Sequence, residues 1–369
     1  MVPSLPSFSA GPLARAALAV SLLACGDGGP NEPNPNQISQ GQQIFRFDTF
    51  GDETFWTDTL RIHEVITTGV SPATALAVGL KVDADALPPG LLQTADLNSP
   101  ATTVALLKLN AVVGLQGTVE TINGQDTLTR VGITCALCHS TVNNSAASGI
   151  GQRLDGWPNL DLNPGAIIAL SPALTDAQKA VYNSWGPGKY DARYNFDGLN
   201  DPAVIPPAYG LSGVNSVTYT GDGDRVAYWN RYVAVTQMHG HGSFAEPRLN
   251  LNVSNPPDQV EAKLPDLEAY QLSLSSPPPP AGSFDAAAAA RGQAVFAGPG
   301  QCSTCHTGTI FTDANARLHP PSEVPTDPTH AQRSATKMYR TTPLRGLWQH
   351  APYFHDGSAA TLSDVVDRY

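Results

Sequence analysis

Cys135-Ala-Leu-Cys138-His139 and Cys302-Ser-Thr-Cys305-His306 are two copies of one pattern, C-x-x-C-H, whose histidines stand 167 positions apart. Two intervening residues place both sulfurs on one turn, facing the two vinyl groups of a single porphyrin, and the histidine lies beneath the ring. The alternatives are a redox dithiol, a zinc site or two disulfides. A redox dithiol does not need the histidine, and a zinc ribbon keeps its cysteine pairs closer together. The pattern predicts two covalently bound haem c groups.

The fifth cysteine, Cys25, follows a short apolar run from Ala16 to Ala24, preceded by Arg15. The run is too short to span a bilayer, and its end resembles a bacterial lipobox, in which the cysteine becomes the lipidated N-terminus. An ordinary secretory signal with a chance cysteine is the alternative. We expect a lipid anchor on Cys25 and a periplasm-facing or cell-surface lipoprotein of a Gram-negative-type bacterium, on the outer membrane by preference.

The composition narrows the class of protein. The chain has 369 residues, of which 33 are glycine, 32 are proline and 14% are charged, and the formal net charge is −11. The glycines are not periodic and the charged fraction is low, which excludes collagen-like and coiled-coil chains. The acidic balance argues against nucleic acid as a partner. Loop-rich domains with short elements are expected.

An internal repeat suggests how the chain is organised. Gly41-Gln-Gln-Ile-Phe45 is similar to Gly292-Gln-Ala-Val-Phe296, which directly precedes the second motif. We interpret both as the first helix of a cytochrome c fold, with a large insertion in the first copy; the alternative is a chance match. The fold predicted is mainly α, with two cytochrome c-like haem domains and long loops. The predicted parts are a signal peptide (1–24), a disordered tether (25–40), a first domain (41–274), a proline-rich linker (275–282) and a second domain (283–369).

Local signals predict several helices. Ser99-Pro100 begins one that would run from 101 to 113, and residues 57–66 are a second candidate. Capping boxes begin at Thr175 and at Thr361. An alanine-rich helix is expected over residues 285–296. A few short strands are expected within residues 187–260.

The C-terminal stretch carries a family resemblance. Its motifs are Tyr339-Arg-Thr-Thr-Pro-Leu-Arg-Gly-Leu-Trp348, Ala351-Pro-Tyr-Phe-His-Asp-Gly357 and Ala360-Thr-Leu-Ser-Asp-Val-Val366. They resemble the di-haem cytochrome c peroxidase family, in particular the enzymes that oxidise tryptophans into a quinone cofactor. The wide separation of the two haem motifs is similar to that of the di-haem rubber oxygenases. The resemblance implies a further helix after Tyr369, so we expect the second domain to be truncated at its C-terminal end.

The resemblance also implies roles for residues around the second motif. His139 would carry the reactive iron, and His306 the iron that passes electrons. Tyr369 would be the distal ligand of the second haem, with Met338 as the alternative. His355 and Arg345 would lie close to the haem, where each can bind a propionate.

For the reactive haem, the sequence offers distal candidates around Met238-His-Gly-His-Gly242. The flanking glycines let the backbone approach a flat ring, so His239 or His241 would line the pocket. The resemblance also requires an acid or base near the iron, for which Glu246 is the candidate. His63 is a further candidate ligand, although a lone histidine on a helix is more often structural. Trp157, Trp185 and Trp348 could each lie between the haems, although tryptophan is ordinarily buried for packing.

These inferences predict a periplasmic di-haem oxidoreductase of the peroxidase type. Peroxide or O₂ would bind at the His139 haem, and electrons would pass through the His306 haem from a small redox donor protein or an organic donor. The alternatives are a non-catalytic di-haem electron carrier and an oxygenase acting on an apolar substrate. The sequence does not decide the substrate, the donor, the oligomeric state or whether a calcium ion lies between the haems.

Overall fold

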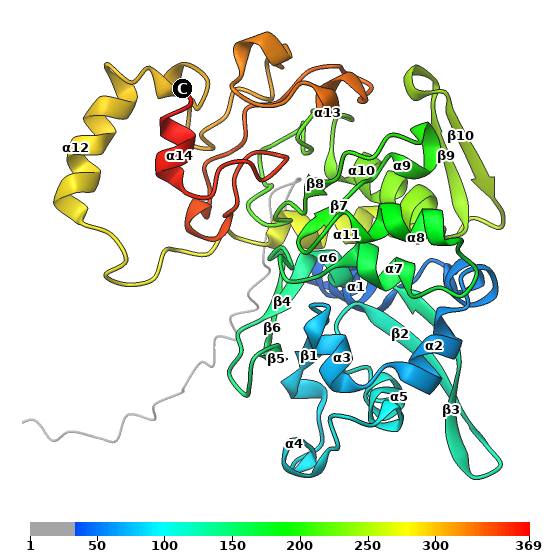
Figure 1. Cartoon of the computed structure of the whole chain (residues 1–369). Helices are drawn as coiled ribbons and strands as arrows, with labels where there is room; N and C mark the ends of the chain where they lie inside the picture. Colours follow the sequence, from blue (N-terminus) through cyan, green and yellow to red (C-terminus); the bar gives the residue numbers. More distant parts are fainter. Residues whose placement is uncertain (1–33) are drawn as a thin grey trace, which may run out of the picture. The chain divides into compact units, whose positions relative to one another are not determined.

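The computed structural model describes residues 34–369, so Cys25 and the predicted signal peptide lie outside the described residues. Short helices joined by long loops make up most of this part (Figure 1). Their bounds are α1 Pro35–Phe47, α2 Ile62–Gly69, α3 Pro72–Ala77, α4 Leu91–Thr94, α5 Pro100–Lys108, α6 Ala136–His139, α7 Pro164–Ala169, α8 Asp176–Asn183, α9 Tyr194–Asp197, α10 Val226–Tyr232, α11 Leu264–Ser273, α12 Ala286–Ala297, α13 Thr329–Gln332 and α14 Leu362–Val366.

Strands occur as two-stranded sheets, one of them parallel and four antiparallel among residues 34–369. The pairs are β1 Val82–Asp83 with β5 Ile150–Gly151, β2 Leu115–Ile122 with β3 Gln125–Ile133, β4 Ser140–Val142 with β6 Arg153–Asp155, β7 Lys189–Tyr190 with β8 Ala203–Val204, and β9 Gly242–Glu246 with β10 Leu251–Asn255. The prediction of a mainly helical chain is therefore correct only in part.

The β2–β3 hairpin is the main element that the sequence reading missed. Its turn is Asn123-Gly124, and both residues have positive φ, 53° and 80°. Two such residues form a type I′ turn, whose twist matches that of the flanking strands. The Asn-Gly pair between runs of β-branched residues was the available signal.

The predicted helices are largely confirmed. Both capping boxes form: the Thr175 and Thr361 side chains accept from the backbone N–H three residues on. Asp285 caps α12 by accepting from two backbone N–H groups. The helix expected to end at Val113 ends at Lys108. The candidate at 57–66 is wrong in detail, because a π-helical turn at Thr54–Thr59 precedes α2.

In the first half, α1 packs against α11, near the centre of Figure 1. A Cβ on Gly41 would lie 1.9 Å from the backbone oxygen of Asp266, so only glycine allows this approach. One turn later, the Phe45 ring meets Tyr270 edge to face with centroids 5.5 Å apart. The disordered tether predicted to reach residue 40 is wrong from Pro35 onward, because α1 begins there.

Side-chain cores occupy the first half of the chain. One cluster gathers around Trp56, Leu107 and Val131, and another around Phe45, Val235 and Leu267. Cys138 packs on the first cluster and Cys135 on the second, so the first C-x-x-C-H motif lies where the two cores meet. Residues 283–369 contribute to neither cluster, and their buried hydrophobic residues are Ala314, Ala331, Tyr339 and Ala359.

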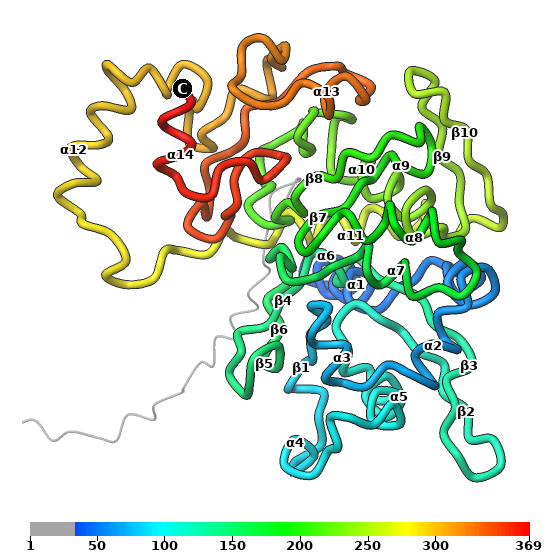
Figure 2. The backbone as a smooth tube through the Cα atoms, in the orientation of Figure 1, coloured from blue at the N-terminus to red at the C-terminus, as the bar shows by residue number. Residues whose placement is uncertain are grey.

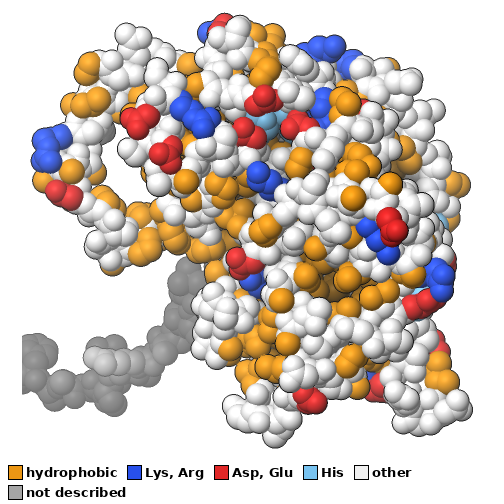
Figure 3. Space-filling model, in the orientation of Figure 1, with side chains coloured by type: hydrophobic (Ala, Val, Ile, Leu, Met, Phe, Trp, Pro, Cys, Tyr) orange, Lys and Arg blue, Asp and Glu red, His pale blue; other side chains and the backbone are white. Residues whose placement is uncertain are grey.

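The chain leaves α11, extends outward to α12 and returns toward the second motif (Figure 2). The space-filling view shows an opening between this outer segment and the rest of the chain (Figure 3). No residue of α12 is buried. A Cβ on Gly292 would meet nothing within 4 Å. The second repeat therefore forms its helix without the packing that the first repeat makes.

Contacts cross the predicted linker, and Pro35–Tyr369 form one compact unit. The segment around Arg340 is joined to the first half by the backbone hydrogen bond from Arg340 N–H to the Tyr219 carbonyl. The linker at 275–282 thus does not separate two independent bodies. None of the helices in the described part of the chain is both long and apolar enough for a membrane crossing.

Candidate haem sites

The first C-x-x-C-H motif begins with Cys135 as the N-cap of α6, which ends at His139. The His139 Nδ1 lies 3.0 Å from the Pro206 carbonyl oxygen. Burial lowers the pKa of His139 to about 4, so the ring is neutral at pH 7. A neutral ring that donates from Nδ1 to a carbonyl presents Nε2 as a free lone pair, which is the arrangement of a metal-binding histidine. The geometry fits an axial iron ligand.

The two cysteines of this motif are partly buried. Burial raises the pKa of Cys135 and of Cys138 to about 12, so both are thiols before any attachment. The Tyr190 hydroxyl lies within electrostatic reach of Cys138 and donates to Gln237 Oε1 at 2.8 Å. This pair is a part of the site that the sequence reading did not identify. No motif marks Tyr190, and only the tertiary structure brings it to the cysteine.

The predicted distal segment touches both cores, because Met238 is buried in the second and its neighbour His239 contacts Phe55 of the first. His239 has a φ of 64° and stacks on Phe55 with ring centroids 3.6 Å apart. Burial lowers the pKa of His239 to about 4. The neighbouring Met238 carbonyl accepts from the Trp56 indole N–H at 3.2 Å. His241 is placed differently, with its Nδ1 3.3 Å from the Pro256 carbonyl.

Glu246 lies at the end of β9 and is held by two neighbours. Arg248 donates to both of its oxygens, at 2.9 and 2.7 Å, and the Tyr228 hydroxyl donates at 2.9 Å. The hydrogen bonds from Arg248 are the main cause that lowers the pKa of Glu246 to about 2. The carboxylate is ionised and already paired, so an acid–base role for Glu246 stays a prediction. His63 lies on α2, and its Nδ1 is buried with no hydrogen-bond partner among residues 34–369.

The second motif starts in a short 3₁₀ turn, Cys302–Thr304. The His306 Nδ1 lies 3.2 Å from the Phe311 carbonyl oxygen, and the backbone of Thr342 also contacts this ring. Burial lowers the pKa of His306. The Phe296 ring of α12 lies 6.4 Å from the His306 ring. Few apolar side chains surround this motif, whereas the first motif is packed by two cores.

Tyr369, the predicted distal ligand of the second haem, is 75% exposed. Its pKa is raised by partial burial of the hydroxyl and by the nearby sulfurs of Cys305 and Cys302. The side chain also borders a surface hollow with Glu323 and Arg368. Met338, the alternative, is partly buried, and its carbonyl accepts from the Thr336 hydroxyl at 3.3 Å. The structure places Tyr369 near the motif, and its ligation stays a prediction.

His355 and Arg345 belong to the predicted second site. His355 is 4% exposed and stacks between Tyr339 and His330, with centroid distances of 5.2 and 4.9 Å. Arg345 Nη1 donates to the carbonyls of Gly210 and Ser212, at 2.6 and 3.0 Å. Propionate contacts of these two residues stay predictions.

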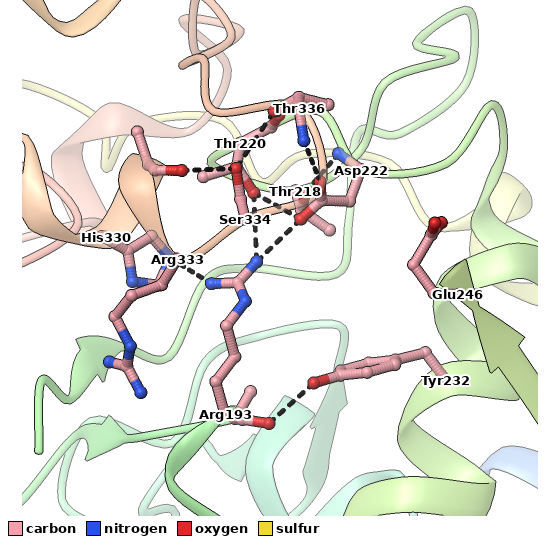
Figure 4. A network of polar contacts seen from close by, with 12 residues as sticks. Arg193, Thr218, Thr220, Asp222, Tyr232, Glu246, His330, Arg333, Ser334 and Thr336 are labelled. Carbon is pink, nitrogen blue, oxygen red and sulfur yellow. Dashed lines mark hydrogen bonds and ion pairs between the residues drawn. The ribbon is translucent and has the colours of Figure 1, made fainter. Parts of the chain in front are cut away.

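A buried ionic network joins the halves beside His330 (Figure 4). Arg193 donates to Asp222 at 2.7 Å, and its other nitrogen lies 3.4 Å from His330 Nε2. Nearby, Arg333 binds Asp191 and Asp197, at 3.0 and 2.7 Å. The sequence reading missed this network, because each pair spans more than a hundred positions or lies in an irregular loop.

Of the three tryptophans predicted as candidates between the haems, two are in contact with each other. Trp157 meets Trp348 edge to face, with ring centroids 5.6 Å apart, and Trp157 also lies 6.5 Å from Tyr209. Trp157 follows Gly156, whose N–H donates to the His139 carbonyl. Trp185 instead packs within the first core, against Tyr182 and Tyr190. The Trp157–Trp348 pair therefore connects the first motif to the C-terminal block.

Arg340 and His350 are further side chains of this region that the sequence reading missed. Burial lowers the pKa of Arg340 to about 10. Burial, followed by the nearby charge of Arg340, lowers the pKa of His350 to about 4. Each keeps a buried nitrogen without a hydrogen-bond partner in the described part of the chain, Nε of Arg340 and Nε2 of His350. Buried donors of this kind fit an anionic guest such as a haem carboxylate.

Comparisons with known proteins point to cytochrome c-like relatives. The RoxA-like, cytochrome c-like family model matches residues 338–368. The methylamine utilization protein MauG of Methylorubrum extorquens is 33% identical over 95 residues, which are 22% of this chain and 24% of that protein. The chain thus matches about a quarter of that relative's length. A Kuenenia stuttgartiensis hydrazine synthase chain aligns with 46% of this chain and 64% of its own, at 20% identity and a TM-score of 0.29. The family and MauG matches thus show similarity to cytochrome c-like proteins over part of this chain, in agreement with the covalently bound haem c that the motifs predict.

Proposed function

We propose that this protein is a di-haem c-type oxidoreductase of the peroxidase type, which binds peroxide or O₂ at the His139 haem and receives electrons through the His306 haem. One observation carries the proposal. At both motifs the histidine Nδ1 faces a backbone carbonyl, of Pro206 and of Phe311, and the tautomer that carries hydrogen on Nδ1 would leave Nε2 for an iron.

The different surroundings of the motifs support different roles. When bound, haem c supplies one-electron chemistry at its iron. His139 is held by the Pro206 carbonyl in a motif that packs against two cores, which fixes the orientation of its ring. His306 lies in a segment with few buried apolar residues, where a donor has easier access. An enclosed reactive site and an open electron entry are consistent with this division.

The side chains around His239 would provide the polar groups that interact with peroxide. His239 is neutral at pH 7, because burial lowers its pKa to about 4, so its ring can accept a hydrogen bond from an incoming peroxide. Phe55 holds that ring in place by stacking. Tyr190 donates to Gln237 and adds a polar edge near Cys138.

The donor and location belong to the same proposal. A small redox donor protein or an organic donor would deliver electrons at the exposed edge around the second motif. A lipid on Cys25 would hold the protein at a membrane outside the cytoplasm; the motivation is the lipobox-like sequence alone. Palmitate labelling of the natural protein, compared with a Cys25→Ser variant, tests this part, and unlabelled wild-type protein contradicts it.

The central experiment is electron paramagnetic resonance of the ferric holoprotein, before and after half-reduction and with peroxide added. We expect one iron with an open or exchangeable axial position that reacts with peroxide. His139→Ala should abolish that reaction, whereas His306→Ala should mainly slow the arrival of electrons. Two low-spin six-coordinate irons, inert to peroxide and rapidly reducible, would contradict the proposal and indicate an electron carrier.

A second experiment tests passage of electrons between the halves. Trp157→Phe should slow inter-haem equilibration several-fold after rapid reduction, since the indole pair joins the two segments. Trp229→Phe is the matched control, because Trp229 is also partly buried but stacks on Tyr232. Equal rates in both variants would exclude a role for the pair.

A further inference from the structure

Arg340 differs from three other arginines in residues 34–369. Arg153 pairs with Asp83, Arg193 with Asp222 and Arg333 with Asp191, each at 3.0 Å or less. Arg340 forms no ion pair with any described carboxylate, and its Nη1 donates to the Ser216 carbonyl at 2.7 Å. The side chain as a whole is partly exposed, but its Nε is buried and has no hydrogen-bond partner among the described residues. A buried donor of this kind favours an acceptor that the described chain does not provide.

His350 supplies a second unpaired nitrogen in the same region. Its Nε2 is buried and has no hydrogen-bond partner among the described residues. The ring lies within electrostatic reach of Arg340 and 6.1 Å from the Tyr209 ring, measured between centroids. An imidazole and a guanidinium with free nitrogens near each other favour one carboxylate-like guest that accepts from both.

The surroundings place these two residues beside the second motif. Arg340 precedes Thr341, whose carbonyl accepts from the Thr312 hydroxyl at 2.5 Å. The backbone of Thr342 interacts with the His306 ring. Arg340 is thus held by the same short segment that contacts the predicted iron ligand. A haem attached to Cys302 and Cys305 would carry its two carboxylates into this neighbourhood.

We propose that Arg340 and His350 form an anion site for a carboxylate of the haem attached at Cys302 and Cys305. This assignment rests on the second haem of the proposed function. It gives the propionate role to residues that differ from Arg345, whose Nη1 already serves two carbonyls. The guanidinium neutralises the carboxylate and so raises the potential at which the iron is reduced.

The test is a spectroelectrochemical titration of the holoprotein with both haems resolved. Arg340→Gln should lower the midpoint of the His306 haem, because the uncompensated carboxylate then stabilises ferric iron. Arg340→Lys keeps the positive charge, so its midpoint should lie close to that of the wild-type protein. His350→Gln should give a smaller shift in the same direction. The control Arg317→Gln removes an exposed charge from the same half and should change neither midpoint.

Several outcomes would overturn the assignment. Unchanged midpoints in both Arg340→Gln and His350→Gln would exclude the site, and a shift confined to the His139 haem would exclude the stated haem. A wild-type midpoint that depends on added acetate or phosphate would identify a free anion as the guest instead. Mass spectrometry distinguishes these outcomes from failure of the proposed function, in which wild-type protein would lack haem on the second motif. If Arg340→Gln does not fold, the midpoint of His350→Gln decides: a lowered midpoint of the His306 haem supports the site and an unchanged one excludes it. Arg340→Lys should then have a midpoint close to that of the wild type.

Discussion

Two helices that share a five-residue pattern have different surroundings. Gly41 of α1 sits directly on the backbone of α11, and Phe45 is fully buried against Tyr270. Gly292 of α12 faces open space, and Val295 is 54% exposed. The same residues therefore produce a packed helix in one place and an isolated helix in the other. Helix formation follows local sequence, whereas packing requires a partner surface.

The halves around these helices differ in the same way. The first motif lies between two side-chain cores, but the 283–369 segment buries three alanines and one tyrosine as its hydrophobic residues. A segment with so little buried apolar surface needs another source of stability. The apolar faces of a covalently attached porphyrin are the natural source, so the halves should respond differently to haem loss.

We expect the largest effect when haem attachment is prevented. In protein made without haem, amides of residues 286–369 should lose hydrogen-exchange protection, while those of the β2–β3 hairpin, α2 and α5 keep it. Exchange read by mass spectrometry checks this, with holoprotein as the control. Equal protection of both halves without haem would remove the proposed difference between them.

The next effect concerns the ionic network that ties the halves together. Arg333→Met leaves Asp191 buried without its cation and should cost about 3–5 kcal/mol of unfolding free energy. Denaturant unfolding measures it. Arg317→Met, which removes an exposed ion pair, should cost about 1 kcal/mol or less. Similar losses in both variants would mean that the network does not stabilise the fold.

A matched glycine pair tests the two helices directly. Gly41→Ala places a Cβ on the Asp266 backbone and should destabilise the protein by about 1–3 kcal/mol. Gly292→Ala meets no atom and should stabilise α12 by about 0.5–1 kcal/mol through helix propensity. Thermal and denaturant unfolding of both variants decide the signs. A loss at Gly292 would show that this face is covered in solution.

The smallest effect depends on pH. The folded-state pKa of Glu246, about 2, is below the ordinary 4.5, so its stabilisation is complete above that ordinary value. The advantage of wild type over Glu246→Gln should shrink as pH falls from about 4.5 toward 2. Unfolding curves across this range measure it, with Glu261→Gln as an exposed control. A constant difference would contradict the Arg248 pairing.

Local sequence was sufficient for the features whose cause is local. The spacing in Cys135–His139 places a histidine directly after two sulfurs, and the Thr175 and Thr361 caps lie within one turn of the groups they bind. The Asn123-Gly124 turn was equally local and could have been predicted. The predicted end of the disordered tether was wrong, because α1 begins at Pro35. The packing of this helix outweighs the proline- and asparagine-rich composition of its first turn.

Only the tertiary structure decided how distant segments meet. The carbonyls that orient His139 and His306 come from irregular loops. The proximity of Tyr190 to Cys138 and the unpaired nitrogens of Arg340 and His350 likewise depend on contacts between distant segments. Loops have no periodic signal, so their long-range partners are not encoded by spacing. The sequence determined two haem-binding motifs and most helices. Burial and charge compensation, which depend on what surrounds each side chain, decided which residues serve them.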